Sequence, residues 1–334
     1  MSKNGLPRKP LTKRRLKNLI LNVLKNPFNM VVLVSLIILF CLIIIPLLTM
    51  ISSTFTLAQG ELRRVQGHVG DFTLYYWKYI LTGKLASAVL WGPLKNSFIC
   101  GFFTVLVSVP LGSVLAWLMI RTDLPGKKIL GLLVTVPYMI PSWTKALAWL
   151  AMFRNSTSGA NGFLAGMGIP IPDWLAYGPI AIVLCMSMHY YAFSYIMVSG
   201  ALRSINSELE EMGEIQGASK AQILRHITLP LILPSVLSAT VMTISKSIGT
   251  YGVPANLGNR IGYYTLATKM RNFIDQGPQA VGYAMSIVLV LLAAVIIFSN
   301  QRIVGVRKSY ATVSGKGGRA TLMPLGKAKK PLMA

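Results

Sequence analysis

Acidic residues are scarce in this chain of 334 residues, which has 9 aspartates and glutamates against 33 lysines and arginines. Charged residues of both signs make up only 13% of the sequence, whereas about 25% is usual in soluble domains. Hydrophobic residues make up 53% and occur in long runs. This composition excludes an ordinary soluble globular domain and predicts an all-α polytopic membrane protein.

Cysteine is also rare, with only Cys41, Cys100 and Cys185, each inside an apolar run. Three cysteines cannot pair completely and their spacing fits no metal site, so we interpret them as small core residues. The run Met30–Thr49 is too long for the core of a signal peptide and is expected to remain as the first span. We therefore expect no metal site and no cofactor.

The basic excess does not indicate nucleic-acid binding, because the basic residues lie mostly beside the apolar runs, where they set membrane orientation. Residues 1–27 and 301–334 are basic segments without a single acid. An even number of spans puts both segments on one side of the membrane, and their charge predicts that both termini are cytoplasmic. The segment 301–334 is rich in Gly, Lys and Pro and is expected to be poorly ordered.

Six apolar segments are long enough to cross a bilayer, which takes about 20 helical residues. The third contains Pro137 and Pro141, which predict a kink or a break. A short interfacial helix is expected near residues 264–275. The predicted spans are Phe28–Ser53, Ser97–Ile120, Leu130–Met152, Gly178–Ala201, Leu231–Tyr251 and Ala280–Asn300.

One polar segment, residues 204–230, lies between the fourth and fifth spans and holds four of the nine acids. Ser207 with Glu210, and Ser219 with Gln222, are capping-box patterns that predict two helix starts. Gly217 lies between them, where a helix end favours a residue with positive φ. We predict two short helices joined by a glycine turn. Their apolar stripe consists of Ile223, Leu224 and Ile227.

The spacing of this segment resembles the EAA motif of permease subunits of binding-protein-dependent ABC importers, which reads E-A-A, three residues, G, nine residues and I-x-L-P. Met212 and Gly213 replace the two alanines. Arg121–Lys127 is similar to the turn after the second span of such permeases. Gly249–Gly258 resembles a stretch of the ferric iron branch and, more loosely, of polyamine, thiamine and phosphonate permeases. The residues in register with the EAA motif are Glu211, Gly217, Ile227, Leu229 and Pro230.

The resemblance implies the MetI-like fold of a type I importer transmembrane domain, with residues 204–230 as the loop that couples it to an ATPase. Glu211 is then the docking residue, and Gly217 permits the turn. The chain contains no P-loop, so we expect a transport subunit that is not an enzyme, with ATP hydrolysis in a separate subunit. The implied coupling residues are Glu211, Gly217, Ala218, Ile227, Leu229 and Pro230.

Three partners follow from the same resemblance: an ATP-binding subunit, a second permease subunit that is identical or paralogous, and an extracytoplasmic solute-binding protein. The implied location is the lipid bilayer of a bacterial cell membrane. One chain supplies half of a translocation pathway, since the six-span pattern is not repeated. Whether the chain is a split half of a fused permease is left open.

Ionisable residues within predicted spans suggest where a substrate passes. Lys246 lies on a polar face with Thr243, Ser245, Ser247 and Thr250, where a cation favours an anionic or anion-chelated substrate. The alternative is that Lys246 snorkels or forms an interhelical hydrogen bond. Lys145 is expected near the outer surface, without a role. The candidate pathway residues are Tyr138, His189, Ser245, Lys246 and Tyr251.

The substrate prediction is ferric iron or a small anion, with polyamine or phosphonate as alternatives. A secondary transporter that uses Lys246 and His189 for ion coupling is a second class, but it predicts inverted repeats that the sequence does not show. An intramembrane enzyme is a third class. It needs a nucleophile and a base, or metal ligands, at matched depth, and only His189 is available.

Overall fold

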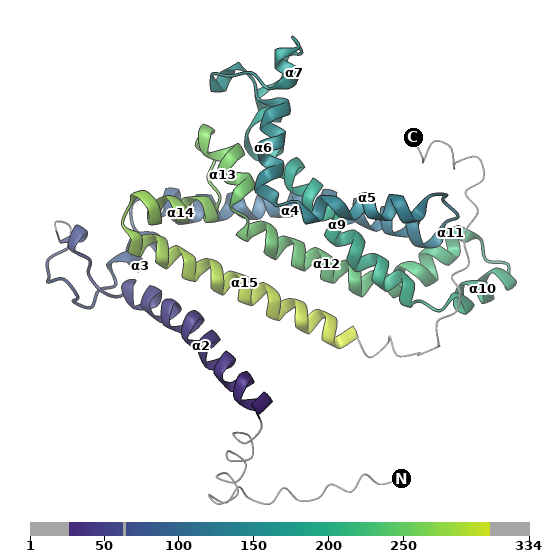
Figure 1. Ribbon diagram of the computed structural model, residues 1–334, viewed down its shortest axis with the longest axis horizontal. Helices are drawn as coiled ribbons and strands as arrows, with labels where there is room; N and C mark the ends of the chain where they lie inside the picture. Colours follow the sequence, from purple (N-terminus) through teal and green to yellow (C-terminus); the bar gives the residue numbers. More distant parts are fainter. Residues whose placement is uncertain (1–26, 63–64, 308–334) are drawn as a thin grey trace, which may run out of the picture. The chain divides into compact units, whose positions relative to one another are not determined.

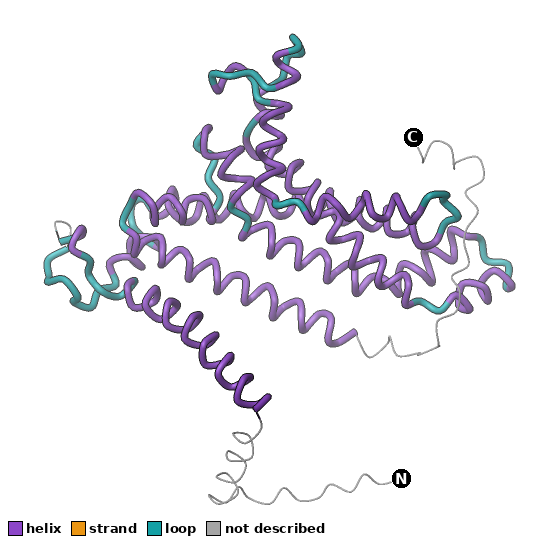
Figure 2. Tube along the Cα trace, in the orientation of Figure 1, coloured by secondary structure: helices purple, strands orange, loops and turns teal. Residues whose placement is uncertain are grey.

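The computed structural model describes residues 27–62 and 65–307. Within these ranges the chain forms helices and loops, and the one β interaction is an isolated bridge between Thr56 and Phe72 (Figure 2). The chain divides into two compact units, Met1–Thr73 and Leu74–Ala334. The described residues therefore confirm the all-helical prediction.

The first unit contains one long helix, α2 (Pro27–Ser53), which coincides with the first predicted span to within one residue. A loop follows and includes a short turn, η1 (Gln59–Glu61). The loop closes on itself, because the amide of Leu57 donates to the carbonyl of Asp71 and the amide of Thr73 donates to that of Phe55. The predicted basic segment 1–27 lies outside the described residues except for Pro27.

Four long helices of the second unit match predicted spans two, four, five and six. Together with α2 they are the five helices among the described residues that are long and apolar enough to cross a membrane. The last one runs past Asn300, so the predicted tail begins as helix, and residues 308–334 lie outside the described ranges. The four are α4 (Gly92–Arg121), α9 (Gly178–Ser204), α12 (Leu229–Gly249) and α15 (Gln279–Arg307).

Helices α4 and α9 pack closely along their length, and both contact α12. The approach is tightest at Gly112, where a Cβ atom would lie 2.4 Å from the carbonyl oxygen of Tyr191. Glycine lets two helix backbones come together in this way, as small residues commonly do in membrane bundles. The cluster beside this contact includes the buried residues Ala116, Val198, Leu202 and Ile232.

The third predicted span is not one continuous helix. It is divided into α5 (Lys127–Met139) and α6 (Ser142–Phe153), with Ile140 in an extended conformation at φ −76° and ψ 130°. Pro141 is the physical reason, because proline disfavours helical conformation in the residue before it and has no amide hydrogen to donate. Figure 1 shows α6 leaving the direction of α5. The predicted span Leu130–Met152 is therefore present as two helices, and the predicted break at the prolines is confirmed.

Short helices lie at both ends of this bundle. Helix α14 is the predicted interfacial helix, and its Leu266 packs in a buried cluster with residues of α3 and α15. Figure 1 shows α3 and α14 at one end and α10 and α11 at the other. The short elements are α3 (Tyr75–Leu81), η2 (Ser87–Trp91), η3 (Ser156–Ser158), α7 (Phe163–Gly166), α8 (Asp173–Ala176), α10 (Ser207–Ile215), α11 (Lys220–Ile223), η4 (Leu224–Thr228), α13 (Gly252–Gly258), η5 (Asn259–Ile261) and α14 (Leu266–Gln276).

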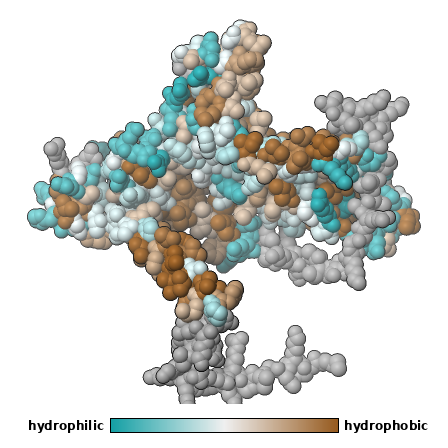
Figure 3. Space-filling model, viewed as in Figure 1, coloured by the Kyte–Doolittle hydropathy of each residue, from teal (hydrophilic) through white to brown (hydrophobic). Residues whose placement is uncertain are grey.

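Large apolar side chains cover much of the outer surface of the second unit. On α5 they include Ile129, Leu132, Leu133 and Met139, all exposed, and Figure 3 shows such a patch. A water-soluble monomer rarely exposes a patch of this kind, whereas a helix facing lipid or another membrane subunit does.

Candidate functional site

The predicted coupling segment, residues 204–230, forms two short helices joined by a turn. Helix α10 begins one residue earlier than the capping pattern indicated, because Asn206 is the N-cap and its side-chain oxygen accepts from the amide of Glu208. The predicted pairing of Ser207 with Glu210 is wrong, since the Glu210 carboxylate contacts other elements. The second capping box, formed by Ser219 and Gln222, is confirmed.

The turn between the two helices depends on Gly217, which has a φ of +80°. The amide of Gly217 donates to the carbonyl of Glu214, and the amide of Ala218 donates to that of Gly213. These bonds close a helix end of the Schellman type, in which a left-handed residue is usually glycine. The prediction that Gly217 adopts positive φ is confirmed.

The second helix continues through η4 into α12, so the loop is joined to the fifth span without a break in helix. Ile223 is buried, and Leu224 and Ile227 are half-buried. A Cβ atom on Gly213 would lie 3.2 Å from Ile227 and 3.3 Å from Ile223, so α10 crosses this stripe very closely. Leu229 and Pro230 are the first two residues of α12, and both are exposed. They therefore form the start of this helix and do not hold the loop to it by buried contacts.

A buried ion pair joins α10 to the membrane helices. The Arg121 guanidinium lies 3.4 Å from the Glu210 carboxylate, with side-chain exposures of 2% and 9%. Arg121 also donates to the carbonyl of Leu202 at 3.2 Å, and the hydroxyl of Thr228 donates to Glu210 at 2.8 Å. These four residues come from α4, α9, α10 and η4. These contacts therefore fix α10 to α4 and α9, and also to η4 within the coupling segment.

The outward surface of α10 combines acids with large apolar side chains. Glu211 is half-exposed, and the described residues give it no ion-pair partner. Leu209 and Met212 are exposed, and Ile215 is 85% exposed. Exposed side chains at this spacing, three residues apart, lie along one side of a helix. Sequence reasoning selected Glu211 and missed the apolar residues, although their spacing was visible within the acidic segment.

A second group of candidate residues meets at the break between α5 and α6. His189 stacks on Tyr138 with ring centroids 5.3 Å apart. The ammonium of Lys246 donates to the Tyr138 hydroxyl at 3.2 Å and lies 4.7 Å from the ring centroid of Phe193. The structure thus brings together three of the five candidate pathway residues, Tyr138, His189 and Lys246.

Lys145, which was expected near the outer surface and without a role, lies beside this group. Its ammonium lies 2.5 Å from Nδ1 of His189 and also contacts the carbonyl of Pro137, which the helix break leaves free. A lysine ammonium can only donate, so Nδ1 of His189 accepts and the ring proton is on Nε2. Lys145 also lines a mostly apolar cavity of about 380 Å³. Tyr138, Lys145, His189 and Lys246 are hereafter the cation cluster.

The remaining pathway candidates lie elsewhere. The described residues give Ser245 and Tyr251 no hydrogen bond to the cation cluster. Thr243 and Ser247 are buried, and Ser247 faces Gly101 of α4, so the predicted continuous polar face on span five is wrong. Helix packing is the reason, because small hydroxyl residues fit close interhelical contacts as readily as they line a pore.

The cation cluster can attract an anion and donate hydrogen bonds to it. Neither Lys145 nor Lys246 has a carboxylate partner among the described residues. Two ammonium groups and a phenol supply several donors, and lysine is a common ligand for phosphate and similar anions. In the described ranges no group of three or more His, Cys, Asp or Glu side chains could hold a metal ion.

The buried ion pair generates a testable prediction. Arg121→Ala or Glu210→Ala alone should destabilise the purified chain by about 3–5 kcal/mol, because each leaves an unpaired buried charge. The double change Arg121→Met with Glu210→Leu should cost less than the two single losses added together. Denaturant unfolding in detergent measures this, and Glu214→Ala, an exposed acid on the same helix, is the control. Additive losses would contradict the coupling.

The sequence of this chain is similar to those of known transport permeases. The chain is 28% identical over 232 residues to PhnV of Salmonella typhimurium, a permease named for 2-aminoethylphosphonate transport, covering 70% of this chain and 80% of that one. It is 27% identical over 180 residues to a sulfate transport system permease of Marchantia polymorpha, covering 53% and 59% of the two chains. The chain thus spans less than two thirds of that relative's length.

A solved structure supports the fold. One chain of a bacterial alginate ABC transporter, crystallised with its alginate-bound periplasmic protein, superposes with a TM-score of 0.62 at 18% identity. The superposition covers 84% of this chain and 95% of that one. Residues 108–308 match the family described as binding-protein-dependent transport system inner membrane component. The chain belongs to this family of membrane components of binding-protein-dependent transport systems.

Proposed function

We propose that this chain is the permease subunit of an ATP-driven importer and carries a small oxyanion of the sulfate or phosphonate class. It supplies half of the translocation pathway and binds a separate ATPase through residues 204–230. The observation that carries the proposal is the coupling loop, a capped helix pair at one end of the bundle that is held to three other elements by Arg121 and Glu210. The family match supports it.

The outward side of α10 is the proposed ATPase contact. It offers the half-exposed Glu211 beside the apolar Met212 and Ile215. Protein interfaces draw most of their affinity from a few apolar or charged anchors that become buried on binding. When ATP closes two ATPase subunits, displacement of α10 reaches α4 through Arg121–Glu210 and α12 through the continuous helix. Movement at the ATPase thereby becomes movement of the spans.

The substrate class follows from the cation cluster. Lys145 of α6 and Lys246 of α12 have no carboxylate partner among the described residues, so an oxyanion would compensate their charge. The permeases named for sulfate and 2-aminoethylphosphonate support this choice. Ferric iron, the other substrate that the sequence suggested, has no such support. The secondary-transporter alternative is not favoured either, because the family is that of binding-protein-dependent systems.

The remaining subunits follow from the same proposal. A second permease subunit completes the pathway, and an extracytoplasmic binding protein delivers the oxyanion at the end of the bundle that carries α3 and α14. The last turn of α15 points toward the α10 end of the bundle (Figure 1), which supports a cytoplasmic C-terminus. The membrane is the cell membrane of a bacterium, and ATP is hydrolysed by the partner subunit.

Loss of ATPase binding tests the proposed docking surface. Glu211→Ala and Ile215→Ser should each weaken co-purification of the ATPase subunit by about tenfold, since each removes an interface anchor. The measurement is pull-down of the ATPase encoded with this chain, with Asp275→Ala as a matched acid removal at the opposite end of the bundle. Unchanged binding in both α10 variants would contradict the docking surface.

Uptake of labelled oxyanion tests the substrate class. Lys246→Gln and Lys145→Gln should each lower the uptake rate of sulfate or 2-aminoethylphosphonate by about tenfold, because each removes a charged hydrogen-bond donor. Assembled transporter in proteoliposomes with its binding protein provides the assay. Lys95→Gln, at an exposed lysine in the first turn of α4, serves as the control. Uptake equal to that of the control in both variants would rule out the cation cluster as the pathway.

A further inference from the structure

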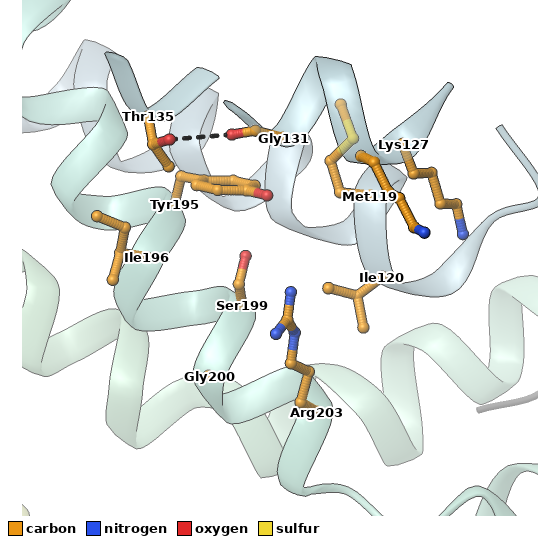
Figure 4. Close-up of a pocket in the computed structure, with 11 residues that line it drawn as sticks. Met119, Ile120, Lys127, Gly131, Thr135, Tyr195, Ile196, Ser199, Gly200 and Arg203 are labelled. Atoms are coloured by element: carbon orange, nitrogen blue, oxygen red, sulfur yellow. Dashed lines mark hydrogen bonds between the residues drawn. The ribbon is translucent and has the colours of Figure 1, made fainter. Parts of the chain in front are cut away.

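A cavity of about 590 Å³ lies between α4, α5 and α9, near the end of the bundle that carries the coupling loop (Figure 4). On α5 its lining runs from Lys127 to Thr135 and includes no residue of the cation cluster, and neither ATPase docking nor the proposed oxyanion pathway uses it. Its lining consists of Met119, Ile120, Lys127, Lys128, Gly131, Thr135, Tyr195, Ile196, Ser199, Gly200 and Arg203.

The charge of the cavity is of one sign. Lys127, Lys128 and Arg203 contribute three cationic groups, and the lining contains no carboxylate. Asp123, which acts electrostatically on Lys127, lies outside the lining. Lys128 and Arg203 are exposed and have no ion-pair partner among the described residues. The cavity therefore carries positive charge at Lys128 and Arg203 that no ion pair among the described residues compensates.

A buried hydroxyl gives an independent indication of a ligand. Ser199 is only 6% exposed, and its Oγ atom has no hydrogen-bond partner in the described structure. Buried polar groups are normally hydrogen-bonded, so an unpartnered hydroxyl in a cavity wall requires an explanation. Figure 4 shows the hydroxyl of Ser199 and the guanidinium of Arg203 directed toward the same space from α9. By contrast, the Thr135 hydroxyl in the same lining already donates to the carbonyl of Gly131 at 3.1 Å.

The start of α5 adds to the positive potential. Gly126 is the N-cap residue and provides no side-chain cap, and Lys127 and Lys128 are the first two residues of the helix. Free amides and the helix dipole at such an end attract anions. Basic residues beside a span often do no more than set its orientation. Setting the orientation of a span would not require a cavity or an unpartnered Ser199 hydroxyl in the cavity wall, so these two features favour a binding site.

We propose that this cavity binds a tetrahedral oxyanion of the phosphate or sulfate class, held by Arg203, Lys127, Lys128 and the Ser199 hydroxyl. The group can be a free anion or the headgroup of an anionic phospholipid, because the two present the same chemistry to the site. The walls formed by Met119, Ile120 and Ile196 are apolar and accommodate either. This site does not depend on the proposed transport function, since it needs neither the ATPase nor the cation cluster.

The test uses the full chain purified without partner subunits. One arm titrates inorganic sulfate and inorganic phosphate, radiolabelled, onto the chain in nanodiscs of phosphatidylcholine alone. The other arm measures, by mass spectrometry, enrichment of phosphatidylglycerol around the chain in nanodiscs of mixed composition. The variants are Arg203→Gln and Ser199→Ala. The controls are Arg302→Gln, an exposed arginine on α15, and Lys95→Gln, an exposed lysine on α4, and all variants are checked for an unchanged unfolding midpoint.

The proposal expects saturable binding in at least one arm, weakened about tenfold by Arg203→Gln and about threefold by Ser199→Ala, and unchanged in both controls. Binding of free anion identifies a soluble ligand, and binding only of phosphatidylglycerol identifies a headgroup site. Absence of binding in both arms, or affinities that do not differ between the variants and Arg302→Gln, would overturn it. An equal loss in Lys95→Gln would show an effect of lysine charge in general and would also overturn it. Ser199→Ala keeps the test decisive if Arg203→Gln folds poorly, because it removes only a hydroxyl.

Discussion

The buried pair of Arg121 and Glu210 is the contact on which the proposed mechanism depends. A short amphipathic helix on a membrane surface is only marginally stable by itself, and α10 has nine residues. The pair fixes it to the end of α4, while Arg121 also holds the end of α9 and Thr228 bonds Glu210 from the start of the fifth span. Both charged groups of this ion pair are buried. Separating them would leave each one buried without a partner, which is energetically costly. Helix α10 and these spans are therefore expected to move together when an ATPase pushes on the loop.

The second constraint is the interruption of the third span at Ile140 and Pro141. The helical donor for the carbonyl of Pro137 would be the amide of residue 141, but Pro141 has no amide hydrogen, so this carbonyl accepts from Lys145 instead. The change of direction between α5 and α6 also brings Lys145 beside His189, and Lys246 donates to the hydroxyl of Tyr138. Irregular backbone within a membrane is tolerated where it lines a cavity. Here the break brings together the cation cluster, which is proposed to bind the oxyanion.

Sequence patterns predicted the features that depend on neighbouring residues, such as helix positions and caps. They failed for side chains whose partners lie far away in the sequence. The span positions, the positive φ of Gly217 and the Ser219–Gln222 capping box follow from neighbouring residues, and the structure has them. Glu210 matched a local capping pattern equally well, but its actual partner, Arg121, lies far away in sequence. Thr243 and Ser247 looked like pore residues because close packing against α4 cannot be read from one helix. Lys145 was missed for the same reason, since its environment depends on how α6 turns after the break.

The central claim is that α10 is the surface on which an ATPase acts, and site-specific photo-cross-linking tests it most directly. A photoreactive amino acid is placed at Ile215, the most exposed apolar residue of α10, and at Ile261, an exposed apolar residue of η5 at the other end of the bundle. After illumination of the assembled transporter in membranes, the account predicts an adduct with the ATPase subunit from position 215 and none from position 261. An ATPase adduct from position 261, or its absence at position 215 while the complex is intact, would contradict the account.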